Sequence, residues 1–309
     1  MRARALPRGL LLLLLGLPAG ALRAQDLDPR AYAVTPQGTN IAIFVYSRLT
    51  GDVLFDPSLP ITNVSASFDS FALGYYRSID FFGRSANVRI ALPYAFGHMS
   101  GQVQERAGSI YRSGLSDTRM QMSVNLLGGP TVSLQDFPRR RPTTNVFASF
   151  TVSAPTGQYS PDKLINIGTN RWAFKPELAL AEPLGKWTLE GYAGAWFFTT
   201  NHEFYRGTSV RSQDPMLGAQ GHVSYTFRPG LWAGLDGTYY RGGATTVDGV
   251  FKNDQQNASR VGVVGSWAFA PRHALKFQYT RTSSVRVGGK FNILSFGYTF
   301  TWFDKKGPR

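Results

Sequence analysis

The sequence predicts a transmembrane antiparallel β-barrel of about twelve strands, exported behind a cleaved N-terminal signal. Three observations support this fold class: a signal-peptide pattern at the start of the chain, a series of segments in which apolar and polar residues alternate, and connections that alternate between long and short. Barrel strands alternate in this way because one face meets lipid and the other meets the lumen. After the signal, no apolar run reaches the roughly 18 residues of a transmembrane helix, so strands are the predicted crossing elements.

Residues 1–24 have the layout of a secretory signal peptide. Basic residues precede an apolar run at 9–17, and small residues follow it, with cleavage sites after Ala21 and Ala24. Charge, apolar run and small residues in this order are typical of export signals, and a run of this length is too short to span a bilayer. We therefore expect cleavage after Ala24 rather than a buried apolar helix at the N-terminus.

Residues 25–38 precede the predicted barrel, which covers residues 39–303, and residues 304–309 form a short tail. Pro29 and Pro36 disfavour a helix or strand in the first segment, which is long enough to fold into the lumen as a short plug. Alternation over about ten residues locates the strands, since a tilted strand needs that length to cross a membrane. The predicted strands are 39–47, 64–78, 85–96, 116–127, 144–154, 171–181, 186–198, 216–228, 231–241, 259–269, 273–281 and 291–303.

The predicted connections alternate in length, as they do in barrels with long extracellular loops and short periplasmic turns. Ten of the eleven follow this rule, with short turns such as 182–185, 229–230 and 270–272. The exception is 128–143, a long connection where a short turn is expected. An even number of strands places both termini on the periplasmic side. A soluble β-sandwich also has short alternating strands, but it does not explain the alternating connections.

The composition excludes several kinds of site. The chain has no cysteine, which rules out disulfides, thiol nucleophiles, cysteine-bound zinc and a lipid anchor on cysteine. The net charge is +14, including four arginines of the signal peptide, but the basic residues are scattered singly. An exported protein meets no nucleic acid, so we expect the basic loops to face lipopolysaccharide and outer-membrane lipid. The barrel-assembly machinery is a further expected partner.

No catalytic or metal-binding motif occurs in the sequence. Asn201-His202-Glu203 lacks the second histidine of a zinc-binding helix motif, and neither a phosphate-binding loop nor a nucleophile elbow is present. His222 and Ser224 share one predicted strand face, but a lone histidine on a lumen face is typical of a polar pore wall. We therefore expect no enzymatic activity, no cofactor and no metal ion.

Strand parity places charged and polar side chains in the lumen. A basic residue facing lipid in mid-bilayer would cost about 2–4 kcal/mol, so alternation should turn such residues inward. Two interpretations remain open: a charge-lined path that selects solutes, with a mild preference for anions, or a lumen closed by salt bridges. The predicted lumen-lining residues are Arg89, Asp117, Arg119, Gln121, Lys175, Glu177, Glu190, His222, Arg228, Asp236, Arg260 and Lys276.

The last predicted strand carries aromatic residues at every second position, at Phe296, Tyr298, Phe300 and Trp302. This pattern resembles the C-terminal signal by which outer-membrane barrels are recognised for insertion. Residues 304–309 follow it, whereas such chains usually end on the aromatic residue. An aromatic girdle at the membrane surface is the alternative interpretation.

Short motifs are spread along the chain near the predicted strand ends. Pro36-x-Gly38-x-Asn40 precedes the first strand, Gly-Leu-Ser-Asp at 114–117 enters the fourth, Ala-Pro-Thr-Gly-Gln-Tyr at 154–159 leaves the fifth, and Asn-Ile-Gly-Thr-Asn-Arg-Trp stands at 166–172. The positions that carry these motifs are Asn40, Asp117, Pro155, Thr156, Gly157, Tyr159, Asn166, Gly168, Asn170, Arg171 and Trp172.

Over most of its length after the signal, the chain resembles the outer-membrane proteins of the "MetA-pathway of phenol degradation" family. It departs from the family's Gly-x-Gly-Asp motif at Ser116, where glycine is usual. The resemblance implies an outer-membrane barrel for passive uptake of small hydrophobic or aromatic compounds, and it supplies no catalytic residue. The alternative is a closed structural barrel that binds lipopolysaccharide or a partner and does not transport.

Overall fold

The computed structural model of the protein describes residues 29–54, 61–103 and 106–304. The predicted signal peptide, its cleavage site and most of the predicted tail lie outside the described residues. Within the part described, no helix is long and apolar enough to cross a membrane.

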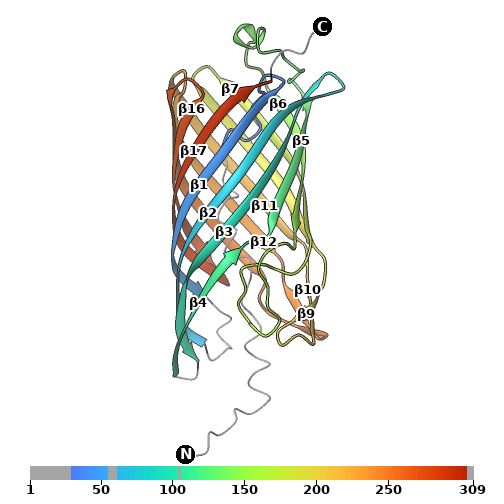
Figure 1. Ribbon diagram of the computed structural model, residues 1–309, viewed down its shortest axis with the longest axis vertical. Coiled ribbons are helices and arrows are strands. Elements are labelled where there is room, and N and C mark those ends of the chain that lie inside the picture. The colour runs from blue at the N-terminus through green and yellow to red at the C-terminus, as the bar shows by residue number, and fades with distance from the viewer. Residues whose placement is uncertain (1–28, 55–60, 104–105, 305–309) are drawn as a thin grey trace, which may run out of the picture.

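Twelve antiparallel strands form one closed ring (Figure 1), which confirms the predicted fold class. The ring closes because β1 pairs with the neighbouring β2 and also with β17, the last strand of the chain. The strands of the ring are β1 (Thr39–Leu54), β2 (Ile61–Phe81), β3 (Arg84–Val103), β5 (Thr118–Leu127), β6 (Asn145–Ala154), β7 (Ala173–Leu184), β8 (Trp187–Phe198), β11 (Met216–Arg228), β12 (Leu231–Gly242), β15 (Gln256–Ala270), β16 (His273–Val285) and β17 (Gly288–Phe303).

The two ends of the barrel differ in their connections. We call the end with two-residue connections, such as 185–186 and 229–230, the turn end, and the opposite end the loop end. At the loop end, β4 (Arg106–Leu115) pairs with β3 beyond the ring. The connections predicted as loops at 199–215 and 242–258 instead contain a small sheet of β9 (Asn201–Phe204), β10 (Ser209–Gln213), β13 (Thr245–Val247) and β14 (Val250–Phe251).

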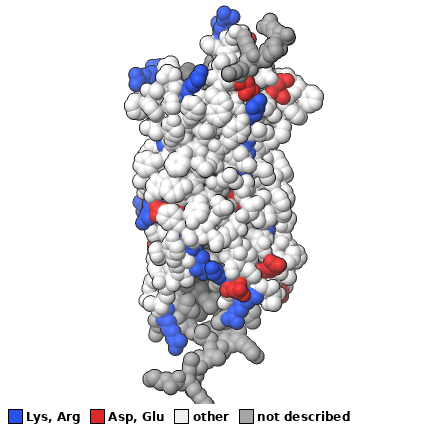
Figure 2. Space-filling view, viewed as in Figure 1, with Lys and Arg blue, Asp and Glu red and all other residues white. Residues whose placement is uncertain are grey.

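Side chains alternate between the two faces of the ring as the sequence predicts. On β7, Lys175 and Glu177 are buried, whereas Leu178 and Leu180 are 57% and 47% exposed. This distribution is the reverse of that in a soluble protein, and it places leucine where a lipid-facing strand requires it. In Figure 2, charged side chains gather toward the two ends of the barrel, and the band between them is mostly uncharged.

The long connection 128–144, the exception to the predicted alternation, has a structural role at the turn end. It contains a short 3-10 helix, η3 (Phe137–Arg139). The backbone N–H of Thr131 donates to the Gly83 carbonyl at 2.9 Å, and the Gln37 N–H donates to the Val132 carbonyl at 2.9 Å. The connection therefore joins the β2–β3 turn to the segment that precedes β1, which a two-residue turn could not do.

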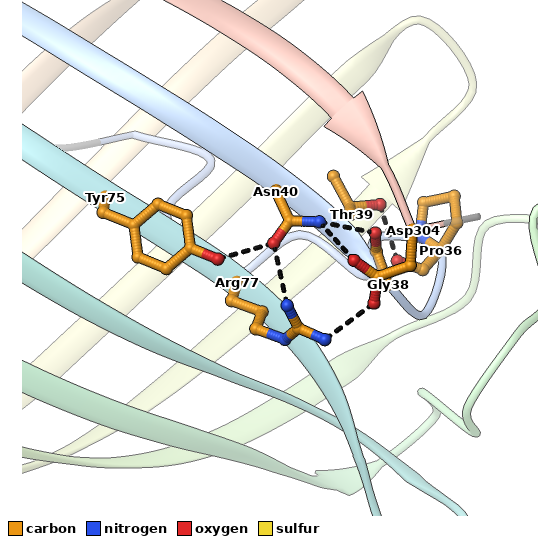
Figure 3. Close-up of polar contacts among 7 residues, drawn as sticks. All are labelled: Pro36, Gly38, Thr39, Asn40, Tyr75, Arg77 and Asp304. Atoms are coloured by element: carbon orange, nitrogen blue, oxygen red, sulfur yellow. Dashed lines mark hydrogen bonds and ion pairs between the residues drawn. The ribbon is translucent and has the colours of Figure 1, made fainter. Parts of the chain in front are cut away.

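A polar cluster fastens the seam between β1 and β17 at the turn end (Figure 3). The Asn40 amide donates to a carboxylate oxygen of Asp304 at 2.8 Å, and Tyr75 donates to the Asn40 side-chain oxygen at 2.5 Å. Arg77 forms an ion pair with Asp304 at 2.7 Å. The Asp304 N–H donates to the Gly38 carbonyl at 2.9 Å. Asp304, assigned from sequence to the tail, thus contacts the first two strands.

Candidate functional site

Residues 29–38 lie inside the ring, where they bond to strands on several sides of the lumen. The Arg30 backbone N–H donates to both carboxylate oxygens of Glu190, at 2.9 and 3.1 Å. The Arg30 side chain donates to Ser224 at 3.0 Å and lies 4.5 Å from the centre of the Trp232 ring. The Arg89 guanidinium donates to the Ala31 carbonyl. These contacts hold the segment across the lumen rather than against one wall.

Tyr32 is the central contact of this segment. Its hydroxyl donates to Glu177 at 2.5 Å and lies 2.8 Å from the Ser149 hydroxyl. Its ring packs edge-on against Tyr192, with ring centres 4.9 Å apart, and tilted against Phe147 at 5.8 Å. A side chain that is 2% exposed and bonded in this way anchors the segment firmly to the inner wall.

Several predicted lumen charges are paired along the wall. Lys175 and Glu177, two residues apart on β7, form an ion pair at 2.8 Å. His222 Nδ1 lies 2.7 Å from Asp236 on the adjacent strand, with both side chains fully buried. Glu190 accepts a hydrogen bond from Tyr192 at 2.7 Å. Both interpretations from sequence therefore have some support: the wall is charged, and many of its charges are satisfied locally.

The other predicted lumen residues take different positions. Arg89, Arg119 and Gln121 line a cavity of about 160 Å³ beside Tyr32, and Gln121 donates to the Tyr32 hydroxyl at 3.2 Å. The Arg260 guanidinium lies 5.9 Å from the centre of the Tyr240 ring.

Two further predicted lumen residues lie near strand ends. Lys276 has the same parity as buried Thr280 on β16. Arg228 is exposed beside the 229–230 turn, past a bulge in β11, so it lies at the rim rather than on the inner wall.

Asp117 was also predicted to line the lumen, and its carboxylate holds the connection 155–172. One oxygen accepts the Gly157 N–H at 3.1 Å, and the other accepts the Thr169 N–H at 3.1 Å and the Thr169 hydroxyl. These bonds bring Gly157 against Gly168, where an added Cβ on either residue would lie 2.6 Å from the backbone of the other. Both motif glycines are therefore required by close backbone contact.

The remaining motif residues shape the same connection. The Thr156 hydroxyl accepts the Thr118 N–H at 3.0 Å. Asn166 closes a short turn, because its amide donates to the Ser160 carbonyl at 3.0 Å and its oxygen accepts the Ser160 N–H at 3.0 Å. Pro155, the first residue after β6, is half-buried.

The end of the connection is tied to the strands that follow it. Asn170 donates to the Asn201 side-chain oxygen at 3.1 Å, and Asn201 donates to the Tyr159 hydroxyl at 3.0 Å. Arg171 donates to the Gln213 side-chain oxygen. The ring of Trp172, in contrast, is 43% exposed. The motif thus builds a folded connection over the loop end.

Beneath this connection lies an apolar pocket of about 60 Å³. Its floor comes from the inner faces of β1, β2, β3 and β17, and its roof comes from the connection 155–172 and the small loop-end sheet. The apolar lining residues include Leu49, Val53, Ala66, Phe68, Met99, Leu164, Ile165, Ile167, Phe204 and Phe291. The polar lining residues include Tyr159, Asn201, Arg171 and Arg211.

Arg211 on β10 is the residue of this pocket that sequence reasoning missed. Its side chain is buried, with 5% exposure, and its guanidinium lies 5.0 Å from the centre of the Phe204 ring. Its Nε has no hydrogen-bond partner among the residues that the structure describes. Burial lowers the pKa of the Arg211 guanidinium, an effect that Asp254 and Tyr159 partly oppose. No local motif marks this arginine, because its burial depends on two connections folding together.

The predicted assembly residues lie on the outer face of β17. Phe300 and Trp302 stack with ring centres 5.8 Å apart, and Trp302 lies 6.0 Å from the Tyr75 ring. The Tyr298 hydroxyl lies 2.6 Å from His273 Nδ1. Phe296 is 48% exposed. The four rings therefore form an aromatic band beside the seam, and their role as an insertion signal stays a prediction.

A closed antiparallel ring with an apolar outer face and a polar lumen defines a β-barrel of the outer membrane. The sequence profile of the family described as "Putative MetA-pathway of phenol degradation" matches residues 42–300, and the chain belongs to this family.

Two solved structures share the architecture. An outer membrane channel from Pseudomonas putida F1 is similar with a TM-score of 0.76 and 22% identity, over 90% of this chain and 100% of that one. The transport unit of the autotransporter AIDA-I from Escherichia coli has a TM-score of 0.54 and 9% identity, over 96% of this chain and 97% of that one. These likenesses concern the fold. No curated protein matches the chain.

Proposed function

We propose that the protein is a passive channel for small hydrophobic or aromatic compounds, with the loop end outside the cell and both termini on the periplasmic side. The observation that carries this proposal is the apolar pocket beneath the connection 155–172. Elsewhere the inner wall is rich in charged and polar groups. The apolar patch is therefore unusual for this wall, and a binding site for an apolar solute accounts for it. Burying apolar surface of a solute there is favourable by about 25 cal/mol per Å².

The family name and the fold of the channel from Pseudomonas putida F1 support the same proposal. The outer leaflet of an outer membrane resists hydrophobic solutes, so an apolar site on the outward side of a barrel would offer them an alternative path. Lipopolysaccharide around the barrel and the assembly machinery are partners that this location implies.

A second candidate function is a closed barrel without transport. The contacts of Arg30 and Tyr32 across the lumen favour it, because they place residues 29–38 where a solute would pass. The two candidates differ in whether that segment leaves its site, and conductance measurements on Tyr32 variants, described in the Discussion, separate them.

Influx of an uncharged fluorescent hydrophobic dye into intact outer-membrane vesicles tests the proposed channel. We expect the barrel to increase the influx rate, and Ile167→Gln to reduce that increase by at least about fivefold, because an amide replaces apolar surface of the pocket with a polar group that is costly to desolvate. Leu134→Gln is the matched control, since Leu134 is 46% exposed on the turn-end connection. Equal influx with and without the barrel, or equal effects of the two variants, would contradict the proposal.

A further inference from the structure

We propose that the loop-end pocket selects small amphipathic carboxylates, with Arg211 receiving the carboxylate and the apolar wall receiving the hydrocarbon part. The inference deepens the proposed function and rests on it, because it names the class of solute that the same pocket prefers. Three features carry the inference: a buried arginine, the absence of an ion-pair partner for it among the described residues, and the apolar surface around it.

In the part of the chain that the structure describes, the charge of Arg211 is buried without a paired anion. Its side chain has 5% exposure, and among the described residues its Nε lacks a hydrogen-bond partner and no carboxylate lies within ion-pair distance of it. A buried charge normally has a partner, because desolvation of an unpaired guanidinium is strongly unfavourable. The Phe204 ring at 5.0 Å supplies a cation–π contact but no opposite charge.

Asp254 acts on Arg211 electrostatically, but its carboxylate is bonded to Thr245. One of its carboxylate oxygens accepts the Thr245 N–H at 2.7 Å, and the other accepts the Thr245 hydroxyl at 2.6 Å. Tyr159, the other group that acts on Arg211 electrostatically, is a phenol whose hydroxyl donates to the Glu203 carbonyl at 2.9 Å. Burial raises the pKa of Tyr159, so this hydroxyl stays neutral and does not balance the arginine.

The chemistry of the pocket defines the ligand. Two guanidinium groups, of Arg211 and Arg171, belong to a lining that is otherwise mostly apolar. A guanidinium pairs with a carboxylate through two parallel hydrogen bonds, which become stronger away from water. Inorganic anions would leave the apolar wall without a partner, and uncharged aromatic compounds would leave Arg211 unpaired.

Calorimetric titration of the full barrel in lipid nanodiscs, with empty nanodiscs as the blank, tests this selectivity. The probes are benzoate and benzamide, which have the same ring and nearly the same shape but differ in charge. We expect benzoate to bind at least about tenfold more tightly than benzamide. In Arg211→Gln, we expect benzoate affinity to fall at least about tenfold and benzamide affinity to change by less than about twofold. Arg211→Lys should keep part of the preference.

Arg206→Gln is the matched control, because Arg206 lies on the neighbouring 205–208 turn with its guanidinium 5.5 Å from the Tyr205 ring at an exposed site. Heat-modifiable mobility on gels shows whether each variant is folded. Binding of benzamide without any preference for benzoate, or an unchanged preference in folded Arg211→Gln, would overturn this inference and leave the proposed function intact. Failure of both probes to bind, together with absent dye influx, would overturn the proposed function as well.

Discussion

The hydroxyl of Tyr32 gives a direct test of how residues 29–38 are held in the lumen. Tyr32→Phe keeps the ring and its contacts with Phe147 and Tyr192 but removes the bond of 2.5 Å to Glu177. A hydrogen bond to a charged group contributes about 1.5–3 kcal/mol. Glu177 keeps its ion pair with Lys175 at 2.8 Å in the variant, so we take about 2 kcal/mol, from the lower part of that range.

Such a loss shifts the ratio of released to docked segment about 30-fold, since each 1.4 kcal/mol is about a factor of ten. We therefore expect single-channel recordings in planar bilayers to show openings that are about 30-fold more frequent in Tyr32→Phe. Tyr46→Phe is the matched control, because the Tyr46 hydroxyl donates to Asp69 at 2.7 Å on the outer face of the barrel. Identical opening frequencies in Tyr32→Phe, Tyr32→Ala and the parent protein would refute the idea that this segment limits conductance.

Three further predictions concern assembly, the seam and selectivity. Phe300→Asp combined with Trp302→Asp should block outer-membrane insertion, because it places charge on the lipid-facing side of β17; a heat-modifiable barrel in the membrane would show that these rings are no signal. Asp304→Ala should lower the unfolding temperature measured by heat modification, because it removes the shared partner of strands β1 and β2, whereas Asp136→Ala on the turn-end connection should leave it unchanged. Arg119→Glu with Arg260→Glu should abolish the expected mild preference for anions, measured as a reversal potential under a salt gradient; cation preference in the parent protein would contradict this prediction, and high salt should weaken the effect.

The ring of strands could be predicted because its signal is repeated in every strand. Each crossing segment must alternate to satisfy lipid and lumen at once, so twelve weak patterns reinforce one another. The positions at which the strands end were harder to predict from the sequence. The strands β2 and β3 continue to Ile61 and Val103 at the loop end, beyond the bilayer-length segments, since pairing with a neighbour continues where no lipid imposes a pattern.

The candidate site was only partly predictable for a different reason. Glu177 and Lys175 follow from strand parity, which is local information. The position of Arg211 depends on the folding of the connections after β6 and β8 against each other, and no periodicity encodes that contact. Asp117 shows the opposite case: strand parity assigned it to the lumen, but its carboxylate is occupied by Gly157 and Thr169, on a connection about 40 to 52 residues farther along the chain. Tertiary hydrogen bonding decided its role.

The path of residues 29–38 also bears on how the ring closes during folding. Neighbouring hairpins of this barrel pair residues that are close in sequence, whereas the seam brings Asn40 to Asp304 across 264 residues. Such a closure carries a large entropic cost and is expected to form late. The segment before β1 bonds to Ser149 and Glu190, on strands from the middle of the chain. Because it ties the first strand to the opposite wall, we expect this segment to hold the open sheet curved before β17 pairs with β1.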